Sequence, residues 1–99
     1  MDFEQLMAQA QELQGKVAAA QEELGRTHVK GIAGAGDCIV ELTGKYDVVN
    51  LIISDALVAR GSAAVTETVI AAMRDAKEKA DALIDKVMGD ATAGMPMPE

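Results

Sequence analysis

An unbroken heptad pattern fills the first quarter of the chain and limits its fold more than any other feature. From Phe3 to Leu24, apolar residues recur at alternating spacings of three and four, which places them in one stripe along a helix. The pattern predicts a helix over residues 2–25, about 35 Å long at the standard rise per residue. The stripe consists of Phe3, Leu6, Ala10, Leu13, Val17, Ala20 and Leu24. Such a helix is long for a chain of 99 residues, so part of it should project or pack against a second chain.

Three glycines, Gly31, Gly34 and Gly36, stand within six residues, which fits either a phosphate-binding loop or a tight turn. A phosphate-binding loop places its glycines between a strand and the N-terminus of a helix, whose free N–H groups hold the phosphates. Here residues 37–43 are rich in β-branched side chains and too short for a helix before the next glycine. Residues 27–33 also have an extended pattern. We therefore expect a turn between two strands, with glycine supplying positive φ.

A third strand is expected over residues 47–53, and it is apolar on both faces. Large apolar residues fill every position from 48 to 53 except Asn50, and Ile39 stands beside Val40 in the second strand. A sheet with one wet face should instead alternate apolar and polar residues. The chain's own helices can cover one face, but the other face also needs cover, so we predict a homodimer.

A second long helix is expected after residues 54–58, from which a short connection reaches Gly61 and Ser62. Ser62 is a good N-cap residue for this helix. An apolar stripe with helical spacing leads from there to Met88, and Gly89 should end the helix. The last residues, 89–99, have too little apolar bulk to pack, and we expect them to form a disordered tail.

Together these segments predict an α+β fold in the order α-β-β-β-α, with a three-stranded antiparallel sheet and two long helices. Residues 1–88 should form a single domain, followed by the tail over 89–99. A domain of this size buries only about two-thirds of the surface that its unfolded chain exposes. It therefore often needs a partner to complete its core.

Charge and aromatic content argue against a nucleic-acid binder. Nine basic and sixteen acidic residues give a net charge of −7 at pH 7, whereas nucleic-acid binders usually carry a basic footprint. No Trp, one Phe and one Tyr leave no platform on which single-stranded bases could stack. The single cysteine excludes an internal disulfide and, without a signal-peptide pattern, indicates the cytoplasm. We expect no membrane span, because no apolar run is long enough.

Cys38 and His28 are the residues to consider for catalysis or metal binding. Cys38 points the same way as Val40 and Leu42, so a buried core thiol is the simpler interpretation. One histidine and one cysteine cannot supply the three or four ligands of a zinc site. The two residues could be near-neighbours across the hairpin, but nothing indicates an oxyanion hole or a substrate pocket. We therefore expect no enzyme, no cofactor, no metal and no small-molecule substrate.

Most helix cations stand four residues from an acidic residue, a spacing that suits ion pairs on a solvated helix surface. The expected pairs are Glu12 with Lys16, Glu22 with Arg26, Arg74 with Glu78, Asp75 with Lys79 and Lys77 with Asp81. Among the helix cations, only Lys86 lacks an acidic residue four positions away within its expected helix. A self-neutralised surface is a simpler interpretation than a dedicated phosphate-contacting surface, so the residues alone indicate a dimeric interaction module.

Several segments follow one another in a distinctive order. A helix rich in Gln and Met precedes the stretch GIAGAGDCIVELTGKYDVVNLIIS with its two glycine turns, and an Asp-x-Leu step, a long alanine-rich helix and a GMPMP ending follow. This order closely resembles the YbaB/EbfC family of bacterial nucleoid-associated proteins over nearly the whole chain. The motifs that carry the resemblance are structural, and none is a catalytic signature.

The resemblance implies a cytoplasmic, nucleoid-associated homodimer shaped like tweezers, whose protruding helices engage duplex DNA with little sequence preference. Chromosome organisation or gene regulation would be its role. The phosphate contacts would come from exposed helix cations, doubled by the two-fold axis and acting against a repulsive global field. The candidates carried onto this chain are Lys16, Arg26, Arg74, Lys77, Lys79 and Lys86.

A second interpretation belongs to a different functional class. The acidic surface and the matched helix charges also suit a protein-interaction adaptor. Such an adaptor would bind DNA repair or replication partners through the heptad stripe or the exposed helix faces, without direct DNA binding.

Overall fold

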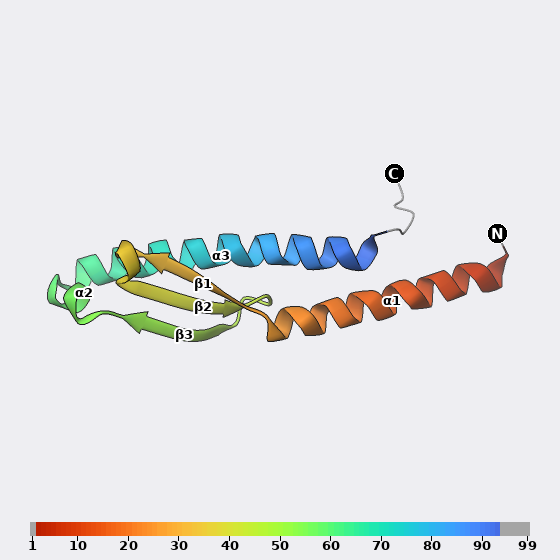
Figure 1. Cartoon of the computed structure of the whole chain (residues 1–99), viewed down its shortest axis with the longest axis horizontal. Coiled ribbons are helices and arrows are strands. Elements are labelled where there is room, and N and C mark those ends of the chain that lie inside the picture. Colours follow the sequence, from red (N-terminus) through yellow and green to blue (C-terminus); the bar gives the residue numbers. More distant parts are fainter. Residues whose placement is uncertain (1, 94–99) are drawn as a thin grey trace.

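The computed structural model describes residues 2–93, which form an elongated fold of 67 × 24 × 16 Å (Figure 1). Its elements are α1 (Phe3–Arg26), β1 (His28–Ala33), the 3-10 turn η1 (Gly34–Gly36), β2 (Cys38–Thr43), β3 (Val48–Ile53), α2 (Asp55–Ala59) and α3 (Ser62–Thr92). The predicted α+β class, with three antiparallel strands between two long helices, is confirmed. The homodimer stays a prediction.

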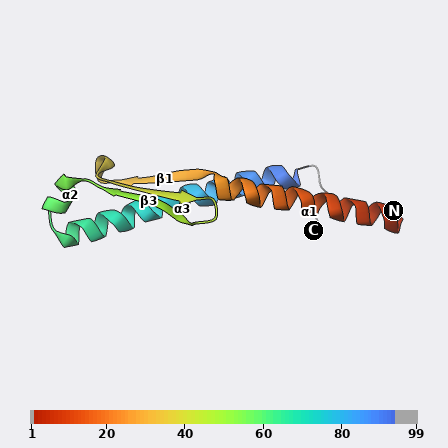
Figure 2. The ribbon, with the colours of Figure 1, turned by 90° about the horizontal axis from the view of Figure 1, so that it is seen from below.

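The helix α1 is anchored at its C-terminal half and projects at its N-terminal half. The Asp2 carboxylate caps the helix by accepting a 2.9 Å hydrogen bond from a backbone N–H of the first turn. Ala20 and Leu24 are buried against Val87 of α3. The other half extends past the end of α3 (Figures 1 and 2), and Phe3 is 74% exposed. The predicted projection of part of this helix is confirmed.

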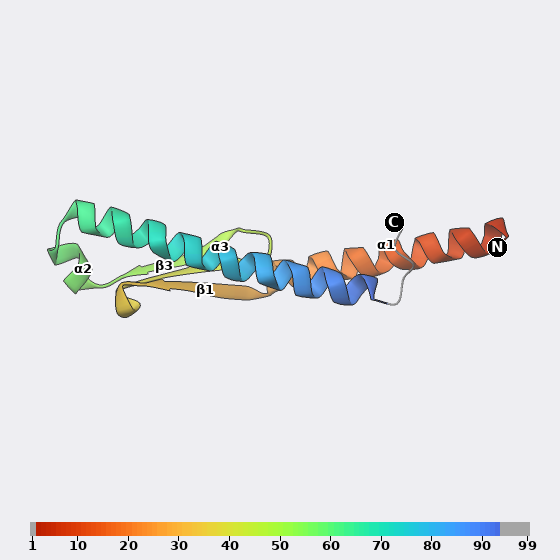
Figure 3. The same cartoon turned by 90° about the horizontal axis from the view of Figure 1, so that it is seen from above.

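The sheet has the order β1-β2-β3 with both pairs antiparallel, and α3 lies along one of its faces (Figures 1 and 3). On that face the alternate β2 side chains Cys38, Val40 and Leu42 are buried against Ala72 and Ala76 of α3. A strand with one face on the core buries every second side chain. The predicted burial of Cys38 is therefore confirmed.

Gly31 sets how closely α3 approaches the sheet. A Cβ atom added there would lie 2.0 Å from the Ala72 carbonyl oxygen and 2.4 Å from the Ala76 nitrogen. Only a residue without a side chain lets the helix backbone come this close to β1. As a result α3 packs over β1 and β2, and β3 lies farthest from it (Figure 1).

The strand β3 exposes apolar side chains on both faces, as predicted. Leu51 is the register partner of the buried Val40, so it lies on the face that carries α3. Ile52 is the partner of Ile39 on the opposite face. Leu51 is 46% exposed and Ile52 is 50% exposed. Within this chain, neither face of the strand is therefore fully covered.

The glycine-rich stretch forms a turn between two strands, as predicted. Gly34, Ala35 and Gly36 all adopt positive φ, with values of 63°, 55° and 97°. This backbone conformation costs glycine little but is uncommon for other residues. The next element is the strand β2, beginning at Cys38, so the geometry is that of a hairpin connection.

The segment between β3 and α3 differs from its prediction. The sequence predicts no helix over residues 54–58, but the helix α2 occupies most of them. Ser54 caps it by accepting a 3.1 Å hydrogen bond from the Leu57 N–H, and Leu57 is fully buried. A helix of five residues is too short for periodicity to predict. The N-cap of α3 is Gly61, and Ser62 is already its first helical residue.

The end of α3 also differs from its prediction. The helix passes through Gly89 and ends at Thr92. Ala91 packs against the cluster of Ala20, Leu24 and Val87, and this packing offsets the cost of a helical glycine, which is roughly 1 kcal/mol. The predicted tail over 89–99 is therefore helical at its start, and residues 94–99 lie outside the described residues.

Candidate nucleic-acid interface

Two of the six candidate cations, Arg74 and Lys77, lie together beside a hollow between α3 and the turn after β2. The hollow measures about 330 Å³ and is lined by Leu42, Tyr46, Met73, Arg74 and Lys77. Both cations stand on one side of α3, because residues three apart share a helix face. Both are exposed, so their charges can reach a ligand outside the protein while apolar groups line the hollow.

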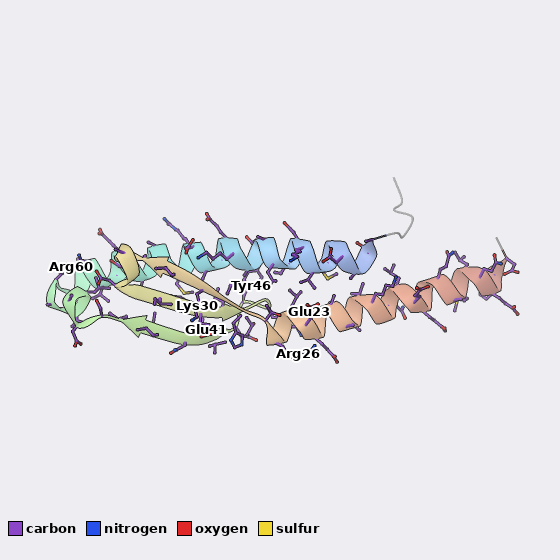
Figure 4. All side chains as sticks on the ribbon, viewed as in Figure 1. Glu23, Arg26, Lys30, Glu41, Tyr46 and Arg60 are labelled. Atoms are coloured by element: carbon purple, nitrogen blue, oxygen red, sulfur yellow. The ribbon has the colours of Figure 1, made fainter. Side chains whose placement is uncertain are left out.

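Tyr46 affects the ion pairing of these cations. Its φ of 66° is uncommon for a residue with a side chain. From the turn after β2 (Figure 4), its hydroxyl donates a hydrogen bond to Asp81 of α3. The hydrogen bond to Asp81 raises the pKa of Tyr46. Asp81 is therefore engaged by the tyrosine and not by Lys77.

The predicted ion pairs of Arg74 with Glu78 and of Lys77 with Asp81 are wrong. Within residues 2–93, the i, i+4 pairs that form are Glu12 with Lys16, Glu22 with Arg26 and Asp75 with Lys79, at N–O distances of 3.5, 3.9 and 3.0 Å. Arg74 and Lys77 thus have no carboxylate within 4.0 Å in the described part of the chain. Their positive charges remain available for an anionic partner.

Lys16 and Lys86 line a second cleft, between α1 and α3. This cleft of about 500 Å³ also includes Glu23 and Asp90 among its lining residues. The expectation that Lys86 lacks an acidic residue four positions away is wrong, because α3 continues past Asp90. The cations of this cleft are balanced by carboxylates, which makes it a weaker phosphate site than the first hollow.

Lys79 and Arg26 lie apart from the other candidates. Lys79 lies 3.0 Å from Asp75 and donates a 2.8 Å hydrogen bond to the Lys30 carbonyl oxygen. Asp75 also accepts a 2.9 Å hydrogen bond from the Ile32 N–H, which together with Lys79 holds the pKa of Asp75 below its usual value. Lys79 thus secures the edge of the sheet, whereas Arg26 is exposed at the C-terminal end of α1 (Figure 4).

Lys45 is a further exposed cation, in the turn after β2, and the sequence gives little reason to select it. It precedes Tyr46 in the turn and is exposed. Its side chain runs 3.6 Å from the position that a Cβ on Gly25 would occupy. Arg60, in contrast, pairs with Asp37 at 3.7 Å. The one sequence signal for Lys45 is its place next to the single tyrosine.

Cys38 and His28 do not form a pair. The register places Cys38 opposite Ala33 and His28 opposite Thr43, at the two ends of the hairpin, so the two residues are not the near-neighbours that the sequence allowed. Burial raises the pKa of the Cys38 thiol, which makes it a poorer nucleophile. His28 Nδ1 lies 3.1 Å from Glu41 Oε1.

Two further kinds of feature are absent from the part of the chain that the structure describes. Among residues 2–93, no group of three or more His, Cys, Asp or Glu side chains could hold a metal ion. In the same part of the chain, no helix combines the length and the apolar character that crossing a membrane requires.

Comparisons with known proteins agree on one family. The profile of the YbaB/EbfC DNA-binding family, which is not an enzyme family, matches residues 1–95. Nucleoid-associated proteins of Rhodospirillum rubrum, Desulfotalea psychrophila and Hyphomonas neptunium are 39%, 35% and 36% identical to the chain. These alignments cover 95%, 100% and 94% of this chain and 89%, 94% and 87% of the relatives.

A solved structure has the same fold. The crystal structure of an uncharacterized protein of Helicobacter pylori superposes with a TM-score of 0.80. The match covers 91% of this chain and 96% of the other, at 21% sequence identity. At this identity the likeness concerns the fold alone.

Proposed function

This chain belongs to the YbaB/EbfC DNA-binding family, and on that basis we propose that it binds duplex DNA as a homodimer with little sequence specificity. It acts in the cytoplasm on the nucleoid, by binding and not by catalysis, and helps to organise the chromosome or regulate its genes. The observation that carries the proposal is the Arg74–Lys77 pair, exposed beside a hollow and without an acidic partner among the described residues.

The two cations suit phosphate groups by their chemistry. The planar guanidinium of Arg74 can donate two parallel hydrogen bonds to phosphate oxygens, and the Lys77 ammonium adds a compact charge. Contacts to the phosphate backbone position a protein on a duplex but carry no base sequence information. Binding through this pair therefore has little sequence specificity.

The net charge of −7 makes binding depend on short-range contacts. Exposed charges farther apart than about 8 Å are largely screened at physiological ionic strength. Carboxylates on distant surfaces then repel DNA weakly, whereas Arg74 and Lys77 act at contact distance. The affinity should accordingly be modest and sensitive to salt.

The homodimer is supported by the uncovered apolar side chains on both faces of β3. A soluble monomer would leave these side chains in water, at a cost of about 25 cal/mol per Å² of apolar surface. A two-fold axis also presents every cation twice, so one duplex can contact two copies of the Arg74–Lys77 pair.

Charge reversal at the pair tests the proposal. We expect the R74E/K77E double variant to lose affinity for a mixed-sequence duplex in fluorescence anisotropy, on all sequences alike. The log–log salt slope should fall by about 1 for each phosphate contact removed. Circular dichroism of the variant should match that of the wild type.

A matched control separates the pair from the global charge. The K16E/K86E variant changes the net charge by the same amount, but in the second cleft, between α1 and α3. It should weaken DNA binding less. Equal losses in both variants would assign the effect to the global field. Unchanged binding by R74E/K77E would exclude the pair as the site.

A protein-interaction adaptor is the second candidate, favoured by the exposed stripe on the projecting part of α1. Phe3 and Leu6 are 74% and 55% exposed, and the acidic residues Asp2 and Glu4 flank Phe3 in the sequence. In this role the stripe binds DNA repair or replication proteins, and DNA is contacted only by those partners.

A pull-down with nuclease digestion distinguishes the adaptor from the DNA binder. Partners that survive digestion and disappear with Leu6→Glu would favour the adaptor. The control Gln5→Glu adds the same charge away from the stripe and should retain them. Loss of every partner on digestion would count against the adaptor.

A further inference from the structure

The N-terminal tip of α1, formed by Asp2, Phe3 and Glu4, places an apolar side chain between two acidic ones. Phe3 is the single phenylalanine of the chain and, at 74%, is the most exposed of the large apolar side chains that the structure describes. Neither Asp2 nor Glu4 has a cation within 4.0 Å among the described residues. The tip thus presents an apolar ring and two negative charges to the outside of the molecule.

The first hollow, beside Arg74 and Lys77, has the complementary properties. It measures about 330 Å³ and is lined by Leu42, Tyr46 and Met73 besides the two exposed cations. An apolar cavity of about 150 Å³ is enough to bind a benzene ring, so a phenyl ring fits here. Aromatic rings and methionine sulfur both make favourable contacts with such a ring. A phenyl group between two carboxylates therefore matches the hollow in size, polarity and charge.

The tip of the same copy cannot reach this hollow. The Gly44 N–H donates a 2.8 Å hydrogen bond to the Leu24 carbonyl oxygen, which fixes the turn that contains Tyr46 beside the C-terminal end of α1. Phe3 lies at the other end of this helix (Figures 1 and 4), about 30 Å away at 1.5 Å per residue. A tip that enters the hollow must therefore come from another molecule.

We propose that the tip of one copy docks in the first hollow of another copy. Phe3 inserts against Tyr46 and Met73, and the two carboxylates of the tip pair with Arg74 and Lys77. The contact joins two different surfaces, so it is heterologous and links copies into rings or chains. It adds to the homodimer of the proposed function and joins one dimer to the next.

Docking of the tip regulates the DNA site, a consequence that rests on the proposed function. The carboxylates of the tip and the phosphates of a duplex need the same two cations, Arg74 and Lys77. One hollow therefore accepts either a tip or DNA at a time. Protein without DNA becomes linked as its concentration rises, and a duplex releases the links that it replaces.

A mixture of two variants tests the contact, because each variant supplies one half of it. The chain contains no tryptophan, so F3W/R74E/K77E carries a single indole reporter on its tip and lacks the cations of the hollow. Phe3→Ala keeps the hollow and lacks the ring of the tip. On mixing, the tryptophan emission should shift to shorter wavelength as the indole leaves water. No shift would overturn the proposal.

The matched control is a mixture of the same reporter with F3A/R74E/K77E, which offers neither a tip nor a hollow. Its emission should stay that of an exposed indole. An equal shift in this control would place the tip elsewhere on the surface and overturn the proposal.

Sedimentation velocity gives a second measurement on the protein without a reporter. The wild type should form species larger than the dimer at high protein concentration. Phe3→Ala should weaken this association about thirtyfold, the effect of a buried interface anchor. Leu6→Ala, one turn away and 55% exposed, should change it by about twofold or less. An equal loss in Leu6→Ala would assign the association to the stripe of α1 and overturn the proposal.

A charge exchange tests the ion pairs between the tip and the hollow. Lys77→Glu should weaken the association by about fivefold, and the double variant E4K/K77E should regain it. Circular dichroism should show the same helix content in both variants, since both side chains are exposed. A double variant that associates no better than Lys77→Glu would overturn the pairing.

The outcomes separate docking of the tip from the proposed function. Adding unlabelled duplex to the mixture of variants should return the emission to that of an exposed indole. A shift that the duplex leaves unchanged would overturn the regulation and retain the docking. A wild-type protein that fails to bind a duplex in anisotropy would overturn the proposed function, whatever the mixture shows.

Discussion

A single methyl group added at Gly31 should destabilise this protein strongly. In Gly31→Ala the new Cβ would lie 2.0 Å from the Ala72 carbonyl oxygen, 2.4 Å from the Ala76 nitrogen and 2.6 Å from the Ala76 Cβ. Two of these atoms belong to the helix backbone and cannot rotate away. To restore an ordinary contact of about 3.5 Å, α3 must move off β1 by about 1.5 Å.

The size of the effect follows from what that movement loosens. Overpacking a core costs about 1–3 kcal/mol where side chains can adjust. Here the displaced helix carries Ala72 and Ala76 away from the fully buried Val40 and Leu57. We therefore expect a loss near the top of that range, about 3 kcal/mol, from a total stability of about 5–15 kcal/mol.

Urea unfolding followed by circular dichroism measures this loss, at one protein concentration because a dimer's stability depends on it. Gly15→Ala is the matched control, since its Cβ would meet nothing within 4 Å on the exposed side of α1. It should stabilise the protein by about 0.5–1 kcal/mol. A Gly31→Ala variant within about 0.5 kcal/mol of the wild type would refute the close contact between α3 and β1.

Three further changes have distinct readouts. Hydrogen bonds from the Ile32 N–H and from Lys79 stabilise the ionised Asp75 carboxylate in the folded protein and so lower its pKa. Asp75→Asn should therefore be less stable than the wild type at neutral pH. That gap should close as the pH falls through the lowered pKa, below 3.8; a gap constant with pH in urea midpoints would contradict this. Tyr46→Phe should weaken DNA binding in anisotropy, because Asp81 is then free to pair with Lys77. Unchanged affinity would show that Tyr46 has no influence on DNA binding. Leu57→Ala should cost about 2–5 kcal/mol in urea unfolding, and a smaller loss would mean that α2 contributes little to the core.

Local patterns in the sequence predict most of the fold, and the errors occur where distant residues decide. The heptad stripe and the glycine turn depend on neighbouring residues, and both are confirmed. The helix end at Gly89 is wrong because Ala91 packs against a cluster that includes Ala20 and Leu24 of α1, far away in the sequence. The helix α2 is missed because a cap from Ser54 and the burial of Leu57 stabilise a helix too short for a periodic signal.

The candidate site is predictable only as a set of six cations. Spacing gives the pair of Lys77 with Asp81 the same weight as the pair of Asp75 with Lys79. In the structure, Tyr46 engages Asp81 from 35 positions away, whereas Lys79 is held against β1. These long-range contacts distinguish the exposed Arg74–Lys77 pair from Lys79, which secures the sheet. No local sequence motif predicts them.

Binding to DNA is tested most directly by fluorescence anisotropy of a labelled mixed-sequence duplex across a salt series, with the dimer checked by sedimentation in the same buffer. We expect saturable binding by the dimer. The logarithm of its association constant should fall linearly with the logarithm of salt concentration, with a slope of about −0.9 for each phosphate neutralised. Binding that does not respond to salt, or no binding at low salt, would contradict a function based on contacts to the DNA backbone.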